Sequence, residues 1–109
     1  MEKVMSLKVE WNKKCYVKVY EYRDDILVAI CDEEVLGKTF SNGKIYFKVS
    51  EEFYGGFKVT LKEALKYVKQ GTIINAVGEN VIKLLAYLNE DILDAVIWIG
   101  KVPHVQVVK

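Results

Sequence analysis

The sequence is poor in the residues that build metal sites and disulfide frameworks. Its 109 residues contain one histidine and two cysteines, Cys15 and Cys31. A structural zinc ion needs three or four clustered ligands, so the residue count excludes that class of site, and we expect no metal or cofactor. Two thiols cannot form a disulfide framework and are typical of proteins from a reducing cytoplasm.

Long hydrophobic runs are also missing. No uncharged stretch approaches the roughly 20 residues that a membrane-spanning helix needs. The first ten residues carry Glu2, Lys3, Lys8 and Glu10 where a signal peptide would have an apolar region. We therefore expect a cytoplasmic protein that does not enter a membrane.

The chain has no excess of charge of one sign. Its formal net charge is +1, so any contact with nucleic acid has to use a local basic patch. Arg23 is the one arginine beside fifteen lysines. This bias, together with few asparagines and glutamines, is found in thermophilic proteins.

The chain is rich in regular hydrophobic patterns. Apolar residues alternate over 14–22, Asn42-Gly43 marks a turn, and Thr60 with Glu63 forms a capping box at a helix start. Strands are predicted over 14–22, 26–31, 44–49, 94–99 and 104–108, and helices over 61–70 and 72–89.

The stretch 72–89 is the centre of this prediction. Apolar residues recur in it at spacings of three and four, as on one face of an amphipathic helix. Eighteen helical residues would span about 27 Å, enough to cross a sheet. Gly78 would lie inside this helix, and a close backbone approach would explain it.

These elements, in the order ββ-β-αα-ββ, predict an α+β fold. We expect a two-layer sandwich, with a mostly antiparallel sheet of about five strands and two helices on one face. Residues 14–109 form a single domain in this prediction. Residues 1–13 are an N-terminal extension that is either an edge strand or an arm.

If the helices cover the face that carries Val17 and Val19, the opposite face is wet and displays alternating tyrosines and lysines. These predicted nucleic-acid-binding residues are Tyr16, Lys18, Tyr20, Lys44, Tyr46 and Lys48. Rings that stack on bases beside ammonium groups that meet phosphates are a feature of single-stranded RNA binding. The same residues are ordinary on a solvated sheet, so a plain solvated face or a protein contact remains open.

His104 opens the last strand and is the candidate general acid or base, since the unperturbed pKa of histidine is about 6.5. Cys31 and Glu79 are the other candidate catalytic residues. A lone histidine at a strand start is more often a surface hydrogen-bonding group. We therefore leave enzymatic activity open and favour a protein that is not an enzyme.

Several segments resemble an archaeal family of unknown function, family 424. They are 16–20 (YVKVY), 31–38 (CDEEVLGK), 49–56 (VSEEFYGG), 75–79 (NAVGE) and 99–106 (IGKVPHVQ). The family's last motif commonly reads Pro-His-Ala-Gln, from which Val105 departs. The motif residues are rich in polar and glycine positions of the kind that build sites on loops. Besides Cys31, Glu79 and His104 they are Glu33, Gly37, Lys38, Tyr54, Gly55, Asn75, Gly78, Pro103 and Gln106.

The resemblance implies a compact archaeal cytoplasmic protein with no assigned activity and a loose association with translation. The leading hypothesis is a binding module that contacts RNA, the ribosome or translation factors. One alternative is a small enzyme or ligand-binding protein that uses His104. Another is a protein-interaction subunit with an aromatic surface of Phe53, Tyr54 and Trp98, and a homodimer also remains open.

Overall fold

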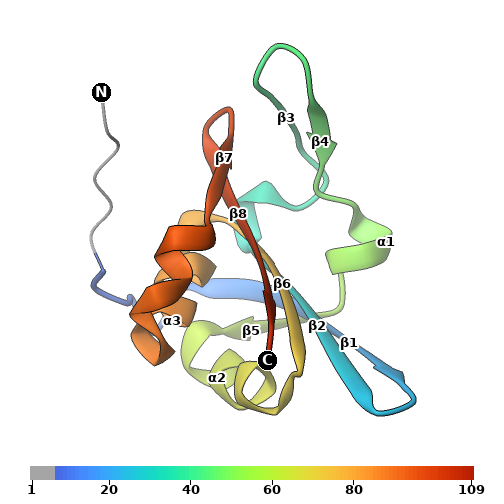
Figure 1. Ribbon diagram of the computed structural model, residues 1–109, viewed down its shortest axis with the longest axis vertical. Coiled ribbons are helices and arrows are strands. Elements are labelled where there is room, and N and C mark those ends of the chain that lie inside the picture. Colours follow the sequence, from blue (N-terminus) through green and yellow to red (C-terminus); the bar gives the residue numbers. More distant parts are fainter. Residues whose placement is uncertain (1–6) are drawn as a thin grey trace.

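The computed structural model describes residues 7–109 and confirms the α+β class (Figure 1). A six-stranded sheet and a separate two-stranded hairpin make up its β structure. β2 and β6 are parallel, and the other neighbours in the main sheet are antiparallel. The strand order is β5 (Phe57–Thr60), β1 (Lys14–Tyr22), β2 (Asp25–Asp32), β6 (Ile73–Val77), β8 (Val102–Val108) and β7 (Ile97–Ile99).

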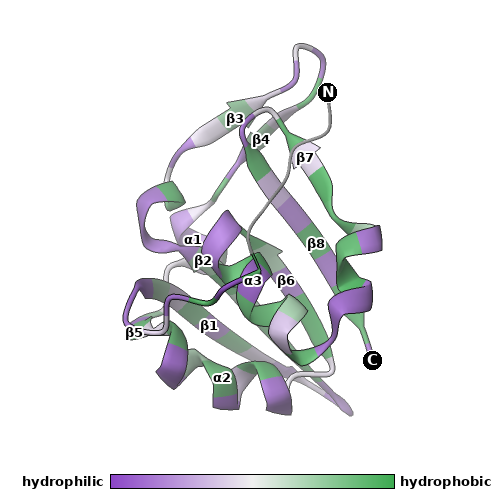
Figure 2. Ribbon diagram, turned by 90° about the vertical axis from the view of Figure 1, so that its left-hand side faces the viewer, coloured by the Kyte–Doolittle hydropathy of each residue, from purple (hydrophilic) through white to green (hydrophobic). Residues whose placement is uncertain are grey.

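Two helices, α2 (Leu61–Gln70) and α3 (Glu79–Leu88), cover one face of this sheet, as predicted. The capping box is present, because the Thr60 side chain accepts from the Glu63 N–H and the Glu63 side chain accepts from the Thr60 N–H. The apolar side of α2, green in Figure 2, packs on Cys15 and Val17 of β1. No helix formed by residues 7–109 is long and apolar enough to cross a membrane.

The predicted helix over 72–89 is wrong in its first third. Ile73–Val77 is strand β6, and the helix begins at Glu79. Ile74 and Val77 fit a helical spacing with Val81, but in the strand Ile74 and Val77 point to opposite faces. Gly78 separates the two elements, with a backbone angle φ of +117° that interrupts any continuous helix.

The opposite face is not wholly wet, which corrects a second prediction. A further core lies there, centred on Ala29, Cys31, Val77 and Tyr54. It is covered by the segment between β2 and β5, in which the sequence predicts only the Asn42-Gly43 turn and the strand 44–49. That segment contains η1 (Glu33–Val35), β3 (Thr39–Ser41), β4 (Tyr46–Lys48) and α1 (Glu51–Tyr54).

Three further differences concern short elements. The strand predicted over 44–49 is β4, which pairs with β3 outside the main sheet. The strand predicted over 94–99 begins within the end of η2 (Glu90–Ala95), and only its last three residues form strand β7. β5 was not predicted at all. Residues 7–13 form no strand, although Val9 lies in the core, and residues 1–6 lie outside the described residues.

Candidate functional site

Side chains on the face opposite the helices lie in rows that cross the sheet. One row contains Tyr16, Cys31, Val77 and His104, which are successive register partners. The next row contains Lys18, Ala29, Asn75 and Gln106. Because strand partners share a face, this register brings residues from distant motifs onto one surface.

Three of the motif residues form one hydrogen-bonded cluster. The Tyr54 hydroxyl donates to Asn75 Oδ1 at 2.5 Å, and His104 Nε2 lies 3.1 Å from the same oxygen. The Phe47 ring packs edge-on against the imidazole, with 5.4 Å between ring centroids. Tyr54 is the last residue of α1, and the Ser50 hydroxyl caps the start of this helix by accepting from the Phe53 N–H. The cluster therefore ties α1 to the centre of the sheet.

The geometry favours neutral side chains throughout this cluster. His104 Nε2 faces an amide oxygen and donates to it, so in the neutral ring Nδ1 carries the lone pair. That Nδ1 atom is buried and has no partner among residues 7–109. Burial lowers the pKa of His104 and raises the pKa of the Tyr54 hydroxyl. The cluster consequently holds no charge at neutral pH.

The three candidate catalytic residues are not gathered in one place. Cys31 and His104 share a row but are two strands apart, a separation of about 10 Å. Burial raises the pKa of the Cys31 thiol to about 12, which leaves it protonated and weakly nucleophilic. Glu79 is exposed at the start of α3. The two thiols are free and buried, with Cys15 in the core beneath the helices and Cys31 in the core on the opposite face.

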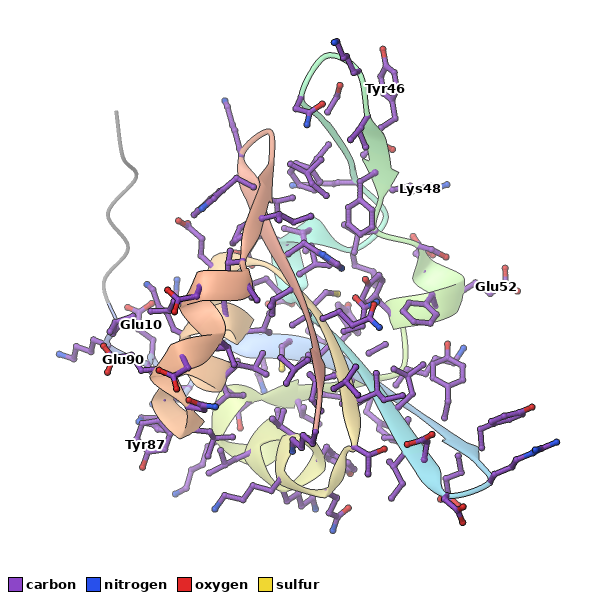
Figure 3. All side chains as sticks on the ribbon, in the orientation of Figure 1. Glu10, Tyr46, Lys48, Glu52, Tyr87 and Glu90 are labelled. Atoms are coloured by element: carbon purple, nitrogen blue, oxygen red, sulfur yellow. The ribbon has the colours of Figure 1, made fainter. Side chains whose placement is uncertain are left out.

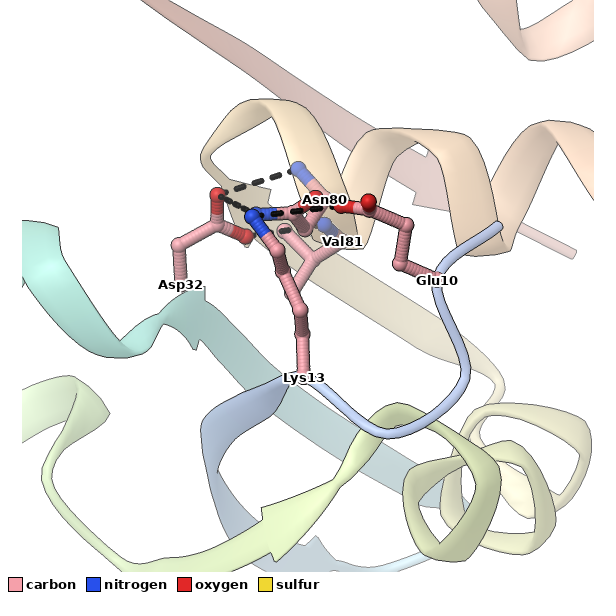
Figure 4. Close-up of polar contacts among 5 residues, drawn as sticks. All are labelled: Glu10, Lys13, Asp32, Asn80 and Val81. Carbon is pink, nitrogen blue, oxygen red and sulfur yellow. Dashed lines mark hydrogen bonds and ion pairs between the residues drawn. The ribbon is translucent and has the colours of Figure 1, made fainter. Parts of the chain in front are cut away.

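A second polar cluster, around Asp32, was missed by the sequence analysis. Asp32 is 2% exposed and accepts hydrogen bonds from the backbone N–H groups of Asn80 and Val81 and from the Asn80 side chain (Figure 4). It thus caps α3 from β2, because Gly78 has no side chain to do so. Burial raises the Asp32 pKa to about 6, against the opposing effect of these donors.

Most of the remaining motif residues shape the backbone. The Gly37 N–H donates to the Val49 carbonyl, and the Gly78 N–H donates to the Pro103 carbonyl. Gly55 ends α1, where a Cβ would lie 2.4 Å from the Glu51 carbonyl oxygen. Glu33 forms an ion pair with Lys58, Lys38 pairs through its backbone with Val49, and Gln106 is exposed.

The predicted nucleic-acid-binding residues lie on two separate sheets. On β1, Tyr16, Lys18 and Tyr20 are half-buried. Lys18 Nζ donates to the Glu52 carbonyl at 2.6 Å, and the Tyr20 hydroxyl donates to the Phe53 carbonyl at 2.8 Å. The Tyr20 ring also stacks on Phe53, so this group partly serves to hold α1.

The other three residues lie on the β3–β4 hairpin and are exposed. Phe40 and Phe47 are paired on its inner face and pack into the second core. Tyr46, 76% exposed, is paired with Ser41, and Lys48 is paired with Thr39. We call Thr39, Ser41, Tyr46 and Lys48 the outer ribbon face, beside which Lys44 lies in the turn.

Thr39 and Ser41 were missed as candidate site residues. The Asn42-Gly43 turn indicates a strand on its N-terminal side, but counting from a two-residue turn would have paired Ser41 with Lys44 and Thr39 with Tyr46. The register in the structure is shifted by two residues, with Ser41 opposite Tyr46 and Thr39 opposite Lys48. The aromatic residues proposed as a surface for a protein partner are at most partly exposed. Tyr54 is 3% exposed, and Phe53 and Trp98 are partly buried.

Comparison with known proteins decides the family. Residues 20–109 match the family described as "Protein of unknown function (DUF424)". The chain belongs to this family. Its fold is similar to that of an uncharacterized conserved protein from Methanopyrus kandleri, with a TM-score of 0.74 and 26% sequence identity over 86% of this chain and 90% of that chain. No curated protein matches the sequence. The family and fold are thus established, and neither indicates an activity.

Proposed function

We propose that this DUF424 protein binds RNA, free or in a ribonucleoprotein, through the outer ribbon face. The observation that carries the proposal is an exposed basic and aromatic hairpin that itself contains no acidic residue. Residues 35–50 contain Lys38, Lys44 and Lys48 and no aspartate or glutamate. None of these lysines forms an ion pair with another described residue. Their ammonium groups are therefore available to phosphates.

The side chains of the outer ribbon face suit an RNA strand. The Tyr46 ring offers a platform for a base, and Lys48 lies two residues further along the same face. The Ser41 and Thr39 hydroxyls stand opposite them, where they can hydrogen-bond a ribose 2′-hydroxyl. In Figure 3, Tyr46 and Lys48 point away from the body of the protein. The hairpin therefore presents these groups without rearrangement.

Fluorescence anisotropy with a labelled single-stranded RNA at about 50 mM salt tests the proposal. We expect Tyr46→Leu to weaken binding about tenfold, because stacking on an aromatic ring contributes about 1–3 kcal/mol per base. Lys48→Gln should weaken binding about threefold and reduce the slope of log K against log salt by about 0.7.

The matched control is Lys66→Gln on α2, an exposed lysine on an element that covers the other face. Its affinity should equal that of the unmodified protein. Absence of binding at low salt, or an equal loss in the Lys66 and Lys48 variants, would refute the proposal. A DNA strand of the same sequence that binds as tightly as the RNA would overturn the preference for RNA.

A further inference from the structure

We infer that the bound RNA is single-stranded and continues from the outer ribbon face across α1 to Lys18 and Tyr20 on β1. This inference rests on the proposed function and extends its site. It joins two groups of residues that belong to different sheets. The contact between them is made by the surface around α1.

Two adjoining hollows connect the groups. One, of about 360 Å³, is lined by Gly37, Lys48, Ser50, Glu51 and Glu52. The other, of about 380 Å³, is lined by Lys18, Tyr20, Ser50, Glu52 and Phe53. Both are lined by Ser50 and Glu52, so the first leads from the hairpin and the second reaches β1. Figure 3 shows Tyr46, Lys48 and Glu52 on the same side of the molecule, away from Tyr87.

The β1 end of this path retains binding capacity. Lys18 Nζ uses one hydrogen bond on the Glu52 carbonyl, and an ammonium group has three donors. Nζ also lies 5.5 Å from the centroid of the Tyr20 ring. Tyr20 and Phe53 are stacked with 5.4 Å between centroids. A phosphate at Lys18 would thus lie beside an aromatic pair that is already ordered.

Carboxylates in the middle of the path decide which part of the strand passes there. The side chains of Glu51 and Glu52 are exposed and have no hydrogen-bond or ion-pair partner among residues 7–109. They repel phosphates but accept hydrogen bonds from base amino and imino groups. Phosphates therefore meet lysines at the two ends, and bases face α1.

This arrangement excludes a regular duplex. In a duplex the Watson–Crick edges are paired and the bases cannot turn towards α1. A ribbon can enter the major groove of B-form DNA, but such binding depends on many phosphate contacts. The outer ribbon face offers Lys48, with Lys44 beside it, and a net charge of +1 adds no general attraction.

A length series tests the inference. Unstructured RNAs of about four and about twelve nucleotides would be compared by anisotropy in the full-length protein, with the matching duplex as competitor. We expect the longer RNA to bind at least about tenfold more tightly, and its salt slope to be larger by about 0.7 for the added phosphate contact. The duplex should compete poorly.

Lys18 variants separate contact from structural support. Lys18→Gln should remove the advantage of the longer RNA and leave the affinity for the shorter RNA unchanged. Lys18→Arg, which keeps the charge, should restore it. Equal affinity for both lengths, or efficient competition by the duplex, would overturn the inference while the proposed function stands. Loss of binding to both lengths in Lys18→Gln would also overturn it, since Lys18 would then act by holding α1.

Discussion

The two faces of the main sheet are built on different principles. The face beneath α2 and α3 is covered by two ten-residue helices whose apolar sides follow the helical period. The opposite face is covered by η1, the β3–β4 hairpin and α1, none of which has more than four residues in a regular element. The helices are held on the sheet by apolar side chains that recur with the helical period, whereas the short elements are held by individual contacts.

A buried polar cluster lies on each face, and the two clusters support different kinds of element. On the helix side, the Asp32 side chain is ionisable and accepts three hydrogen bonds that cap the N-terminus of α3. On the other side, Tyr54, Asn75 and His104 are neutral, and His104 Nδ1 lacks a partner among residues 7–109. The first cluster completes a helix, whereas the second fixes a loop on the sheet. The exposed candidate surface lies on the elements η1, β3, β4 and α1 that cover this second face, where regular helix and strand segments are short.

Gly78→Ala should give the largest loss of stability. The φ of +117° at Gly78 is a conformation that essentially only glycine adopts, and a Cβ would lie 2.4 Å from Asp32 Cγ. We expect a loss of about 4 kcal/mol in the free energy of unfolding, measured by urea titration. Gly43→Ala is the matched change on the hairpin, with φ of +98° and no atom within 4 Å of the added Cβ. It should cost about 1 kcal/mol, and equal losses would contradict the comparison.

The pH dependence of stability tests the Asp32 cluster. Because burial raises the Asp32 pKa from 3.8 to about 6, the folded protein binds a proton in that interval that the unfolded chain has released. This group's contribution is therefore largest below about pH 4 and falls by about 3 kcal/mol as the pH rises to about 6. Asp32→Asn should lack this fall, which denaturant titrations between about pH 4 and pH 6 would measure. If the unfolding free energy of the unmodified protein relative to Asp32→Asn instead rises with pH, the N–H donors outweigh burial.

The sequence predicted the helix-covered face well because its signals are local. The alternation in β1 and the capping box at Thr60 each depend on neighbours within a few residues. The exception was β6, where Ile74 and Val77 suit a helix as well as a strand. The decisive feature was Asp32 approaching Gly78, which is a contact over 46 positions in the chain and leaves no local pattern.

The second face was predicted less well, and for the same reason. The motif residues were identified from their resemblance to a family, but their grouping depends on the register of β6 with β8 and on the position of α1. Neither can be derived from spacing. The tyrosines and lysines were found by alternation, yet alternation cannot show that β4 leaves the main sheet. The hairpin signal Asn42-Gly43 was the one local feature that pointed to it.

Tyr54→Phe tests how the second cover is held. Removing the hydroxyl leaves Asn75 Oδ1 with one donor in a partly buried position, which should cost about 1–2 kcal/mol. Amide hydrogen exchange should accelerate over residues 33–56 and stay unchanged in α2 and α3. Tyr67→Phe is the control, because the Tyr67 hydroxyl makes no hydrogen bond to another residue among 7–109. Faster exchange across the whole protein would mean that the cover is not a separate unit.

The smallest effect concerns the titration of His104, which can be followed without ambiguity because it is the single histidine of the chain. Burial without a charged partner lowers its pKa, so the NMR midpoint should lie below the ordinary value of about 6.5. Its contribution to stability is full above that value and declines as the pH falls, opposite in sign to that of Asp32. Asn75→Asp, which places a carboxylate at the partner position 3.1 Å from Nε2, should raise the midpoint. A midpoint above the ordinary value in the unmodified protein would require an acidic group near the ring, and it would return His104 to consideration as a general acid or base.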